Sequence, residues 1–176
     1  ISPNEIYKDF YIDLKKVLAC NNVAFFQLRL KKTQEYKIII IAKKIQKITK
    51  KYKIKFLIND SAKIAKLINA DGFHLGQKDG SAELERINLK NKIIGITCHN
   101  SKSLAKTAIK NNVDYLAFGS FNKSHLKPKA KKADLKILKW AKKNTKKPIV
   151  AIGGINNLNY KKLINAGAKY IAISSY

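Results

Sequence analysis

Short apolar runs alternate along the chain with longer stretches in which apolar residues recur at helical spacing. The short runs are rich in β-branched and aromatic residues, and their near-continuous hydrophobicity is typical of strands that are buried on both faces of a parallel sheet. Strands are therefore predicted at residues 24–30, 55–58, 72–75, 93–97, 115–119, 149–152 and 170–173. Ile1 is interpreted as the stump of one earlier strand.

Amphipathic stretches lie between these runs and predict helices. They cover residues 4–19, 33–51, 61–69, 81–88, 101–111, 134–144 and 156–165. Most of them begin with Ser, Thr, Asn or Asp, whose side chains accept hydrogen bonds from the unpaired N–H groups of a first helical turn.

This alternation predicts an α/β fold, a (β/α)8 TIM barrel formed by residues 1–176 as a single domain. The chain is shorter than the roughly 200 residues of the smallest usual barrels. We therefore expect a barrel that is clipped at the first strand and the last helix. An open, doubly wound sheet is the alternative, but the predicted strands are one too many for its usual form.

The charge is strongly positive, because 37 basic residues face 11 acidic ones and leave a net charge of +26. Such a charge favours an anionic partner, yet Arg29 and Arg86 are the only arginines, and proteins that read nucleic acids depend heavily on arginine. The lysines are spread over nearly every segment, at the polar positions of the predicted helices. Nucleic-acid binding beyond nonspecific adsorption is therefore not expected.

The remaining composition indicates a soluble protein of a reducing compartment. No run approaches the roughly 18 apolar residues of a membrane span, and no signal peptide opens the chain. Cys20 and Cys98 have no CxxC or Cys/His ligand spacing, which argues against disulfides and structural zinc. We expect a cytoplasmic protein without a membrane partner.

Polar residues gather directly after the predicted strands, at residues 27–31, 59–60, 74–79, 97–100, 120–132, 153–155 and 174–175. The carboxyl ends of barrel strands face one mouth, where the active sites of this fold are built. These clusters are therefore the candidate functional residues.

The same segments resemble the thiamine phosphate synthase family, which shares a superfamily with thiazole tautomerase. The resemblance extends over nearly the whole chain, in the order QLRLK, FLINDSAKIAKLINADGFHLGQKD, IIGITCHN, DYLAFGS, PIVAIGGIN and AGAKYIAISS. Its most specific part is ND followed by HLGQKD. The resemblance implies transfer of a hydroxymethylpyrimidine group from its diphosphate to the ring nitrogen of a thiazole phosphate, with Mg²⁺ as cofactor and release of pyrophosphate.

Asp60 and Asp79 are the candidate Mg²⁺ ligands. They follow adjacent strands, and two such carboxylates can share one Mg²⁺ whose other positions take water and diphosphate oxygens. The alternative for each is a helix cap or a loop turn.

Arg29 and Lys31 are the candidate catalytic residues on the strand 24–30, and Gln27 is a candidate substrate ligand beside them. Phe26 and Leu28 mark the opposite, packed face. The guanidinium fork of Arg29 suits a pair of diphosphate oxygens, and Lys31 adds a positive charge where the leaving group becomes negative.

Gly153 and Gly154 allow close backbone approach of a phosphate, and the N–H groups of Ser174 and Ser175 are expected to complete its cradle. The glycine pair is alternatively a simple tight turn. By resemblance to the family, further substrate ligands are Asn59, Thr97 and Ser124, and Lys127 is a catalytic lysine that closes on the diphosphate.

Three positions depart from the family pattern: Leu30, Ser61 and Leu126. Two alternatives to a synthase follow, namely a tautomerase-like isomerase with His99 as acid and base, and a noncatalytic paralogue that binds a phosphorylated ligand. A basic binding module is a third. Retention of HLGQKD favours the synthase, because a tautomerase handles no diphosphate. We interpret His99 as packed or hydrogen-bonded, and His74 as a core or cap histidine.

Overall fold

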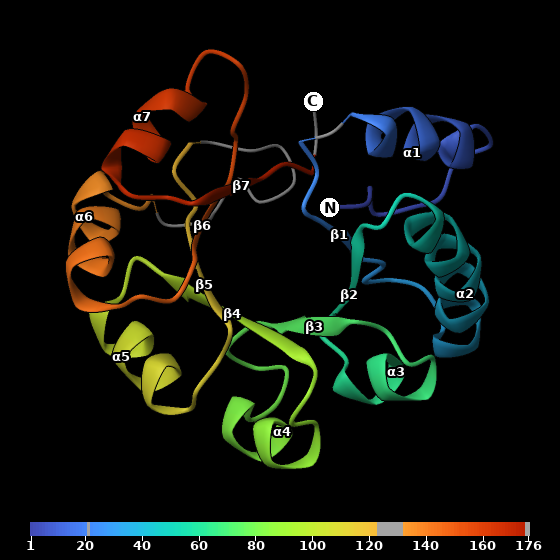
Figure 1. Ribbon diagram of the computed structural model, residues 1–176, viewed down its shortest axis with the longest axis horizontal. Coiled ribbons are helices and arrows are strands. Elements are labelled where there is room, and N and C mark those ends of the chain that lie inside the picture. Colours follow the sequence, from blue (N-terminus) through green and yellow to red (C-terminus); the bar gives the residue numbers. More distant parts are fainter. Residues whose placement is uncertain (21, 123–131, 175–176) are drawn as a thin grey trace. The chain divides into compact units, whose positions relative to one another are not determined.

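The computed structural model describes residues 1–20, 22–122 and 132–174. Helices and strands alternate through this part of the chain (Figure 1). The order is α1 (Phe10–Ala19), β1 (Phe25–Leu28), α2 (Glu35–Lys51), β2 (Lys55–Asn59), α3 (Ala62–Leu67), β3 (Gly72–Leu75), α4 (Ala82–Asn88), β4 (Ile93–His99), α5 (Lys102–Lys110), β5 (Tyr115–Phe118), α6 (Leu135–Asn144), β6 (Ile149–Ile152), α7 (Tyr160–Ala166) and β7 (Tyr170–Ala172).

The chain divides into two compact units. Unit 1 comprises Ile1–His74 and Asn91–Ile93, and unit 2 comprises Leu75–Lys90 and Ile94–Tyr176. Each is described by itself below, and the single domain expected from the sequence stays a prediction.

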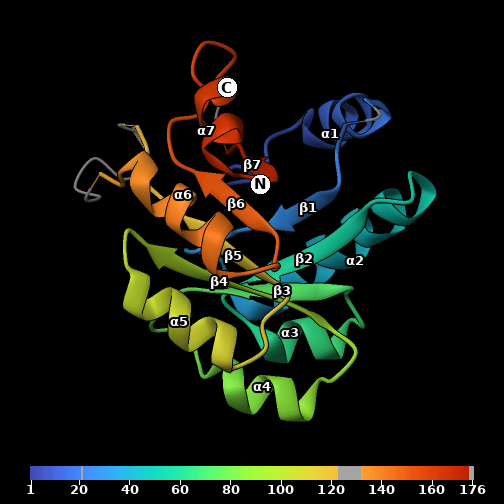
Figure 2. The same ribbon diagram turned by 60° about the vertical axis from the view of Figure 1, so that its left-hand side comes forward.

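In unit 1 the strands β1, β2 and β3 are parallel neighbours in chain order. The long helix α2 lies alongside β2 (Figure 2). Phe26 and Phe56 are register partners, and their rings stack with centroids 6.4 Å apart. Ile45 of α2 is fully buried, as are Phe56 and Phe73, so aromatic and aliphatic side chains form the core of this unit.

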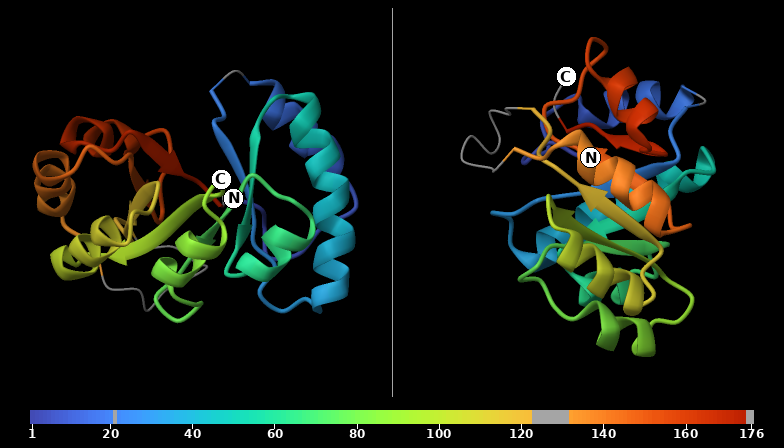
Figure 3. Two further views of the ribbon diagram at one scale, coloured as in Figure 1. Left: turned by 60° about the horizontal axis from the view of Figure 1, so that its bottom comes forward. Right: turned by 90° about the vertical axis from the view of Figure 1, so that its left-hand side faces the viewer.

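In unit 2 the strands β4, β5, β6 and β7 are also parallel and in chain order. Helices α5, α6 and α7 follow one another beside these strands (Figure 3, left). Leu116 and Phe118 of β5 are fully buried, together with Leu138 of α6 and Leu163 of α7. Parallel strands in chain order, with a helix between each strand and the next within each unit, confirm the predicted α/β class.

All predicted strands and helices are present, and the serine caps are placed correctly. The side chains of Ser61, Ser81 and Ser101 accept hydrogen bonds from backbone N–H groups in the first turns of α3, α4 and α5, and Asp134 does so for α6. These caps satisfy donors that have no partner within a helix.

Three helices begin two or more residues later than predicted, among them α2, which starts at Glu35 rather than at residue 33. Helix α1 starts at Phe10 rather than at residue 4, and α7 starts at Tyr160 rather than at residue 156. Before α7, Asn156 accepts a hydrogen bond from Leu158 N–H at 3.0 Å, and Asn159 accepts one from Asn156 N–H at 3.0 Å. Asparagine side chains close such turns readily, so they compete with helix formation.

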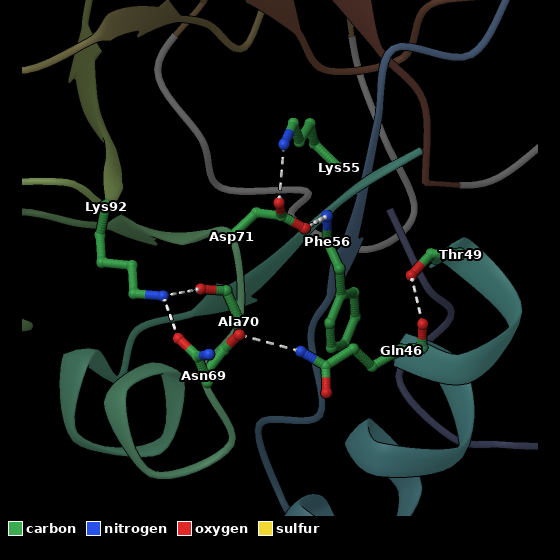
Figure 4. Close-up of polar contacts among 8 residues, drawn as sticks. All are labelled: Gln46, Thr49, Lys55, Phe56, Asn69, Ala70, Asp71 and Lys92. Carbon is green, nitrogen blue, oxygen red and sulfur yellow. Dashed lines mark hydrogen bonds and ion pairs between the residues drawn. The ribbon is translucent and has the colours of Figure 1, made fainter. Parts of the chain in front are cut away.

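The loop between α3 and β3 ties neighbouring strands together (Figure 4). The carboxylate of Asp71 accepts hydrogen bonds from Phe56 N–H at 2.9 Å and from Lys55 Nζ at 3.0 Å. Lys92 donates to Asn69 Oδ1 at 2.5 Å and to the Ala70 carbonyl at 2.7 Å. Burial alone raises the pKa of Asp71, but these hydrogen bonds and lysine charges outweigh it, so the pKa lies below its ordinary value.

The loop between α5 and β5 repeats this arrangement in unit 2. Asp114 accepts hydrogen bonds from Ile94 N–H at 2.7 Å and from the Arg86 guanidinium at 2.5 Å. Lys147 donates to Asn112 Oδ1 at 2.7 Å. Asn69 and Asn112 both have positive φ, 53° and 50°, a conformation that asparagine tolerates better than most residues. We call these two Asn-x-Asp loops the strand clips.

Of the helices within the described residues, none combines the length and the apolar character needed to cross a membrane.

Candidate functional site

Three of the predicted residues lie in β1 or just after it: Gln27 is in the strand, and Arg29 and Lys31 follow its end. Phe26, Leu28 and Leu30 are buried, whereas the alternate residues Gln27, Arg29 and Lys31 are half-buried or exposed. Buried and more exposed residues thus alternate from Phe26 to Lys31, although β1 itself ends at Leu28, and a common face for the three polar side chains stays a prediction.

Gln27 and Asn59 meet at the carboxyl ends of β1 and β2. Gln27 Nε2 donates to Asn59 Oδ1 at 2.5 Å, across 32 residues of sequence. This bond leaves the side-chain oxygen Oε1 of Gln27 as an acceptor, and the side-chain nitrogen Nδ2 of Asn59 as a donor, for other groups. The pair thus presents an acceptor beside a donor.

Asp60 forms an ion pair with Lys31, with 3.1 Å between Oδ2 and Nζ. The Asp60 side chain is 29 % exposed, and its backbone has a φ of 65°. Ser61 caps α3, so helix capping does not account for Asp60. The backbone N–H of Asp60 bonds to the His74 carbonyl at 2.8 Å, which fixes this turn to β3.

Arg29 contacts the segment that precedes α1. Its Nη1 donates to Asn4 Oδ1 at 2.7 Å, and its backbone N–H donates to Ser2 Oγ at 2.8 Å. Neither residue was a candidate from the sequence. Both are polar residues that follow Ile1, the predicted stump of an earlier strand. Polar residues after a predicted strand are the signal that identified the other candidates.

Asp79 lies in unit 2, in the loop between β3 and α4. Its Oδ2 accepts a hydrogen bond from Gly76 N–H at 2.8 Å, so this carboxylate does close a loop turn. Ser81 caps the following helix. Gln77 Nε2 donates to the Thr97 carbonyl at 2.5 Å, which ties the loop to the end of β4.

Gly153 and Gly154 follow β6 with φ values of 105° and 57°. Asn122 N–H donates to the Gly153 carbonyl at 3.0 Å, and a Cβ on Gly153 would lie 2.7 Å from Cα of Ser120. A side chain does not fit here, so the chain needs glycine for close backbone approach as well as for its turn. The Nδ2 atom of Asn122 is buried and has no hydrogen-bond partner within the described residues.

A hollow of about 430 Å³ lies in unit 2 beside this turn, between the ends of β5, α6 and α7. Among the described residues it is lined by Phe121, Asn122, Lys132, Ala133, Asp134, Leu135, Lys162 and Leu163. Ser174 is half-buried after β7. The predicted site residues Ser124, Lys127 and Ser175 lie outside the described residues.

Two of the three histidines, His74 and His99, lie within the described residues, and their surroundings differ. His74 is 8 % exposed and is a core residue, as predicted. His99 is exposed at the end of β4, with a φ of 52°, so it is not a packed histidine, and the alternative of a hydrogen-bonded histidine stays a prediction. The register with β5 shifts between Thr97 and His99, which turns the chain outward after the buried Cys98. Burial raises the pKa of the Cys98 thiol to about 12.

The carboxylates of Asp60 and Asp79 suit Mg²⁺ by donor type. Both are hard oxygen ligands, and both are partly exposed at the carboxyl end of a strand. Within the described residues, no group of three or more His, Cys, Asp or Glu side chains is placed to hold a metal ion. The residues therefore fit an ion that takes one or two protein carboxylates and completes its shell with water and phosphate, as Mg²⁺ does.

Comparison with known proteins shows one consistent relationship. The family model described as thiamine monophosphate synthase matches residues 1–176. The chain is 55 % identical over its whole length to the thiamine-phosphate synthase of Pelagibacter ubique, of which the match covers 86 %. It is 38 % identical over 99 % of its length to the thiamine-phosphate synthase of Erythrobacter litoralis, of which 84 % is covered.

Solved structures give the same result. The thiamine phosphate pyrophosphorylase from Pyrococcus furiosus matches 99 % of this chain and 83 % of its own, with a TM-score of 0.88 and 28 % identity. An aldolase from Escherichia coli K12 matches 98 % of the chain and 73 % of its own, with a TM-score of 0.76 at 11 % identity, and so shares the fold alone. The fold is TIM-barrel-like, which confirms the class predicted from the sequence.

Proposed function

Because the chain belongs to the thiamine monophosphate synthase family, we propose that it couples hydroxymethylpyrimidine diphosphate to thiazole phosphate and releases pyrophosphate. The observation that carries the proposal is in unit 1. Gln27 with Asn59, and Lys31 with Asp60, form two contacts at the carboxyl ends of β1 and β2. Four candidate residues from distant parts of the sequence thus lie in direct contact in two pairs.

The proposed reaction breaks the carbon–oxygen bond between the pyrimidinylmethyl group and the diphosphate, and the electron pair leaves with pyrophosphate. The thiazole nitrogen donates its lone pair to the same carbon and becomes positively charged. No proton transfer is required at either atom. Catalysis therefore depends on positioning and on stabilising the charge that develops on the leaving group.

Arg29 and Lys31 are the proposed stabilising residues for the diphosphate. The guanidinium offers two parallel donors to an oxygen pair, and the ammonium of Lys31 is a compact charge. Until substrate binds, Asp60 balances the charge of Lys31 at 3.1 Å. Lys127 is proposed as a third cation by its resemblance to the family's loop lysine.

Gln27 and Asn59 are the proposed ligands of the pyrimidine ring. A pyrimidine with an amino group next to a ring nitrogen presents a donor beside an acceptor. The Gln27–Asn59 pair presents the complementary acceptor and donor. Their mutual hydrogen bond fixes this order, because rotating one amide would set two like groups against each other.

The phosphate of the thiazole substrate is proposed to bind near Gly153 and Gly154. Their lack of side chains exposes backbone N–H groups, which suit anions. The buried Nδ2 donor of Asn122, which has no partner among the described residues and lies next to Gly153, adds to this proposal. Ser124, Ser174, Ser175 and Thr97 remain proposed substrate ligands on the resemblance to the family.

By the resemblance to the family, Asp60 of unit 1 and Asp79 of unit 2 are each proposed as a ligand of Mg²⁺. When bound, the ion would neutralise charge on the diphosphate and so make it a better leaving group. Asp79 is already oriented by Gly76 N–H, and Asp60 is held by its backbone turn and by Lys31.

The assay that tests the function is pyrophosphate release from the two substrates, with and without Mg²⁺. We expect Mg²⁺-dependent release. Asp79→Asn should abolish it and leave the thermal stability unchanged, because the asparagine amide oxygen can still accept the Gly76 N–H and this strand-end loop contributes little to the core. Asp134→Asn is the matched control in unit 2, since asparagine also caps helices and should keep full turnover.

Each outcome has a distinct meaning. Normal release by Asp79→Asn would overturn the metal assignment. If the parent protein releases no pyrophosphate but isomerises a thiazole without metal, the isomerase with His99 is the better interpretation. Ligand binding without any turnover would support a noncatalytic paralogue.

A further inference from the structure

Arg29 is held by a segment that the proposed mechanism does not use, residues 2–4 before α1. Ser2 is 3 % exposed, and its backbone N–H donates to the Gln27 carbonyl at 2.9 Å. Its Oγ accepts the Arg29 backbone N–H at 2.8 Å. Ser2 therefore holds the backbone on both sides of Leu28, on the edge of β1 that does not pair with β2.

Asn4 acts on the side chain of Arg29. Its Oδ1 accepts a hydrogen bond from Nη1 at 2.7 Å, across 25 residues of sequence. Arginine is long and flexible, and Arg29 is only half-buried, so packing alone does not select one orientation of its guanidinium. A fixed acceptor on one nitrogen restricts the group to orientations that leave the other N–H donors available.

The chemical nature of this acceptor matters. A carboxylate in the same place would hold the guanidinium equally well, but it would also cancel its charge. An amide oxygen is neutral, so it orients the group and leaves its charge available to an anion. This combination is what a diphosphate-binding arginine needs.

We propose that Asn4 is a positioning residue that orients the guanidinium of Arg29 toward the diphosphate, with Ser2 fixing the backbone beneath it. The proposal rests on the proposed function, because it assumes that Arg29 binds diphosphate. It adds two residues from a segment that has no motif of its own.

The test compares Asn4→Ala in two backgrounds, the parent and Arg29→Ala, by the dissociation constant of the pyrimidine diphosphate in calorimetry. In the parent background we expect weaker binding by roughly fivefold to tenfold, the value of one hydrogen bond to a partly exposed charged group. In the Arg29→Ala background the same change should have no further effect, because its target is gone.

Kinetics provide a second measurement. Asn4→Ala should lower kcat/KM for the pyrimidine diphosphate by a similar factor and leave KM for thiazole phosphate unchanged. Asn4→Asp keeps the acceptor but adds a charge, so it should hold Arg29 in place and still bind diphosphate more weakly, with a penalty that shrinks as salt is raised. Glu5→Gln is the control, an exposed neighbour that should behave like the parent.

The outcomes separate the two levels of the proposal. Equal losses in both backgrounds, or no loss in the parent, would overturn the role of Asn4 and leave the function intact. A parent protein that neither binds pyrimidine diphosphate nor releases pyrophosphate would overturn the function itself. Asn4 is exposed, so its variants should fold, and unchanged melting temperatures would verify this.

Discussion

Lys31 and Asp60 illustrate how one contact serves two proposed roles. At 3.1 Å they balance each other's charge, and both are partly exposed, so the pair contributes little to stability. In the proposed mechanism Lys31 leaves Asp60 to bind the diphosphate, and Asp60 leaves Lys31 to bind Mg²⁺. A weak ion pair lowers the free-energy cost of this exchange. Strong pairing would have to be broken at each turnover.

Arg29→Lys tests the geometry of the donor rather than its charge. Lysine keeps the positive charge but loses the two-pronged fork, so turnover should fall by roughly 10- to 150-fold. Affinity for thiazole phosphate should change far less. Steady-state kinetics with each substrate varied in turn would measure this, and equal losses for both substrates would place Arg29 elsewhere.

Gly76→Ala tests how the Asp79 carboxylate is held. A Cβ at this position would lie 2.6 Å from Asp79 Oδ2, so the carboxylate must move. The Mg²⁺ concentration for half-maximal activity should rise roughly tenfold or more, as for other residues that orient metal ligands. Lys78→Ala in the same loop is the control, and an unchanged Mg²⁺ requirement in Gly76→Ala would contradict the prediction.

At the scale of the elements, the strand clips connect helix ends to the preceding strands. In both, an aspartate accepts the N–H of a residue near the start of a strand, and a lysine holds the asparagine with positive φ. Both lie at the amino ends of strands, whereas the proposed site residues follow the carboxyl ends of strands. In this fold that end serves stability.

Asp71→Ala should destabilise the protein by about 1–3 kcal/mol, because the N–H of the buried Phe56 loses its partner. Asp71→Asn should cost less, since its amide oxygen can still accept that bond. Denaturant unfolding of the two variants measures both effects. Equal losses would mean that the charge of Asp71, and not its acceptor, determines the contribution.

The same clip predicts a pH dependence. The pKa of Asp71 lies below its ordinary value in the folded protein, so its stabilisation is present above about pH 4, the unfolded value, and is lost as the pH falls through the folded pKa. The difference in unfolding free energy between parent and Asp71→Asn should therefore shrink below about pH 4. A constant difference down to about pH 2 would exclude this linkage.

At the scale of the whole molecule, charge is the dominant feature. With 37 basic and 11 acidic residues, at least 26 basic side chains have no acidic counterpart even if every acid were paired. Mutual repulsion among them opposes the compact state. The expected cytoplasmic location stays a prediction.

Added salt should consequently stabilise this protein. Raising NaCl from about 0.02 M to about 0.5 M should increase the melting temperature by several degrees, because screening weakens the repulsion. Potassium chloride should have the same effect at equal ionic strength. A melting temperature that falls with salt would show that attractive ion pairs outweigh the repulsion.

The helices and strands and most candidate site residues could be predicted from the amino-acid sequence. Hydrophobic periodicity and capping residues are local features of a sequence. Every strand and most helix caps could therefore be predicted from neighbouring residues, as Ser61 and Ser101 illustrate. The polar strand ends followed from the rule that parallel strands present their carboxyl ends together. The family motif added the proposed reaction.

Which of these residues form contacts with one another could be read only from the tertiary structure. The contacts Gln27–Asn59 and Arg29–Asn4 join positions 32 and 25 residues apart. Such contacts depend on strand register and on loop conformations, which residue types specify only weakly. Helix α1 begins six residues later than its sequence pattern predicts, and Ser2 and Asn4, in the non-helical segment before it, contact Arg29. Local propensity cannot foresee these contacts, because Arg29 lies 27 residues from Ser2 and 25 residues from Asn4 in the sequence.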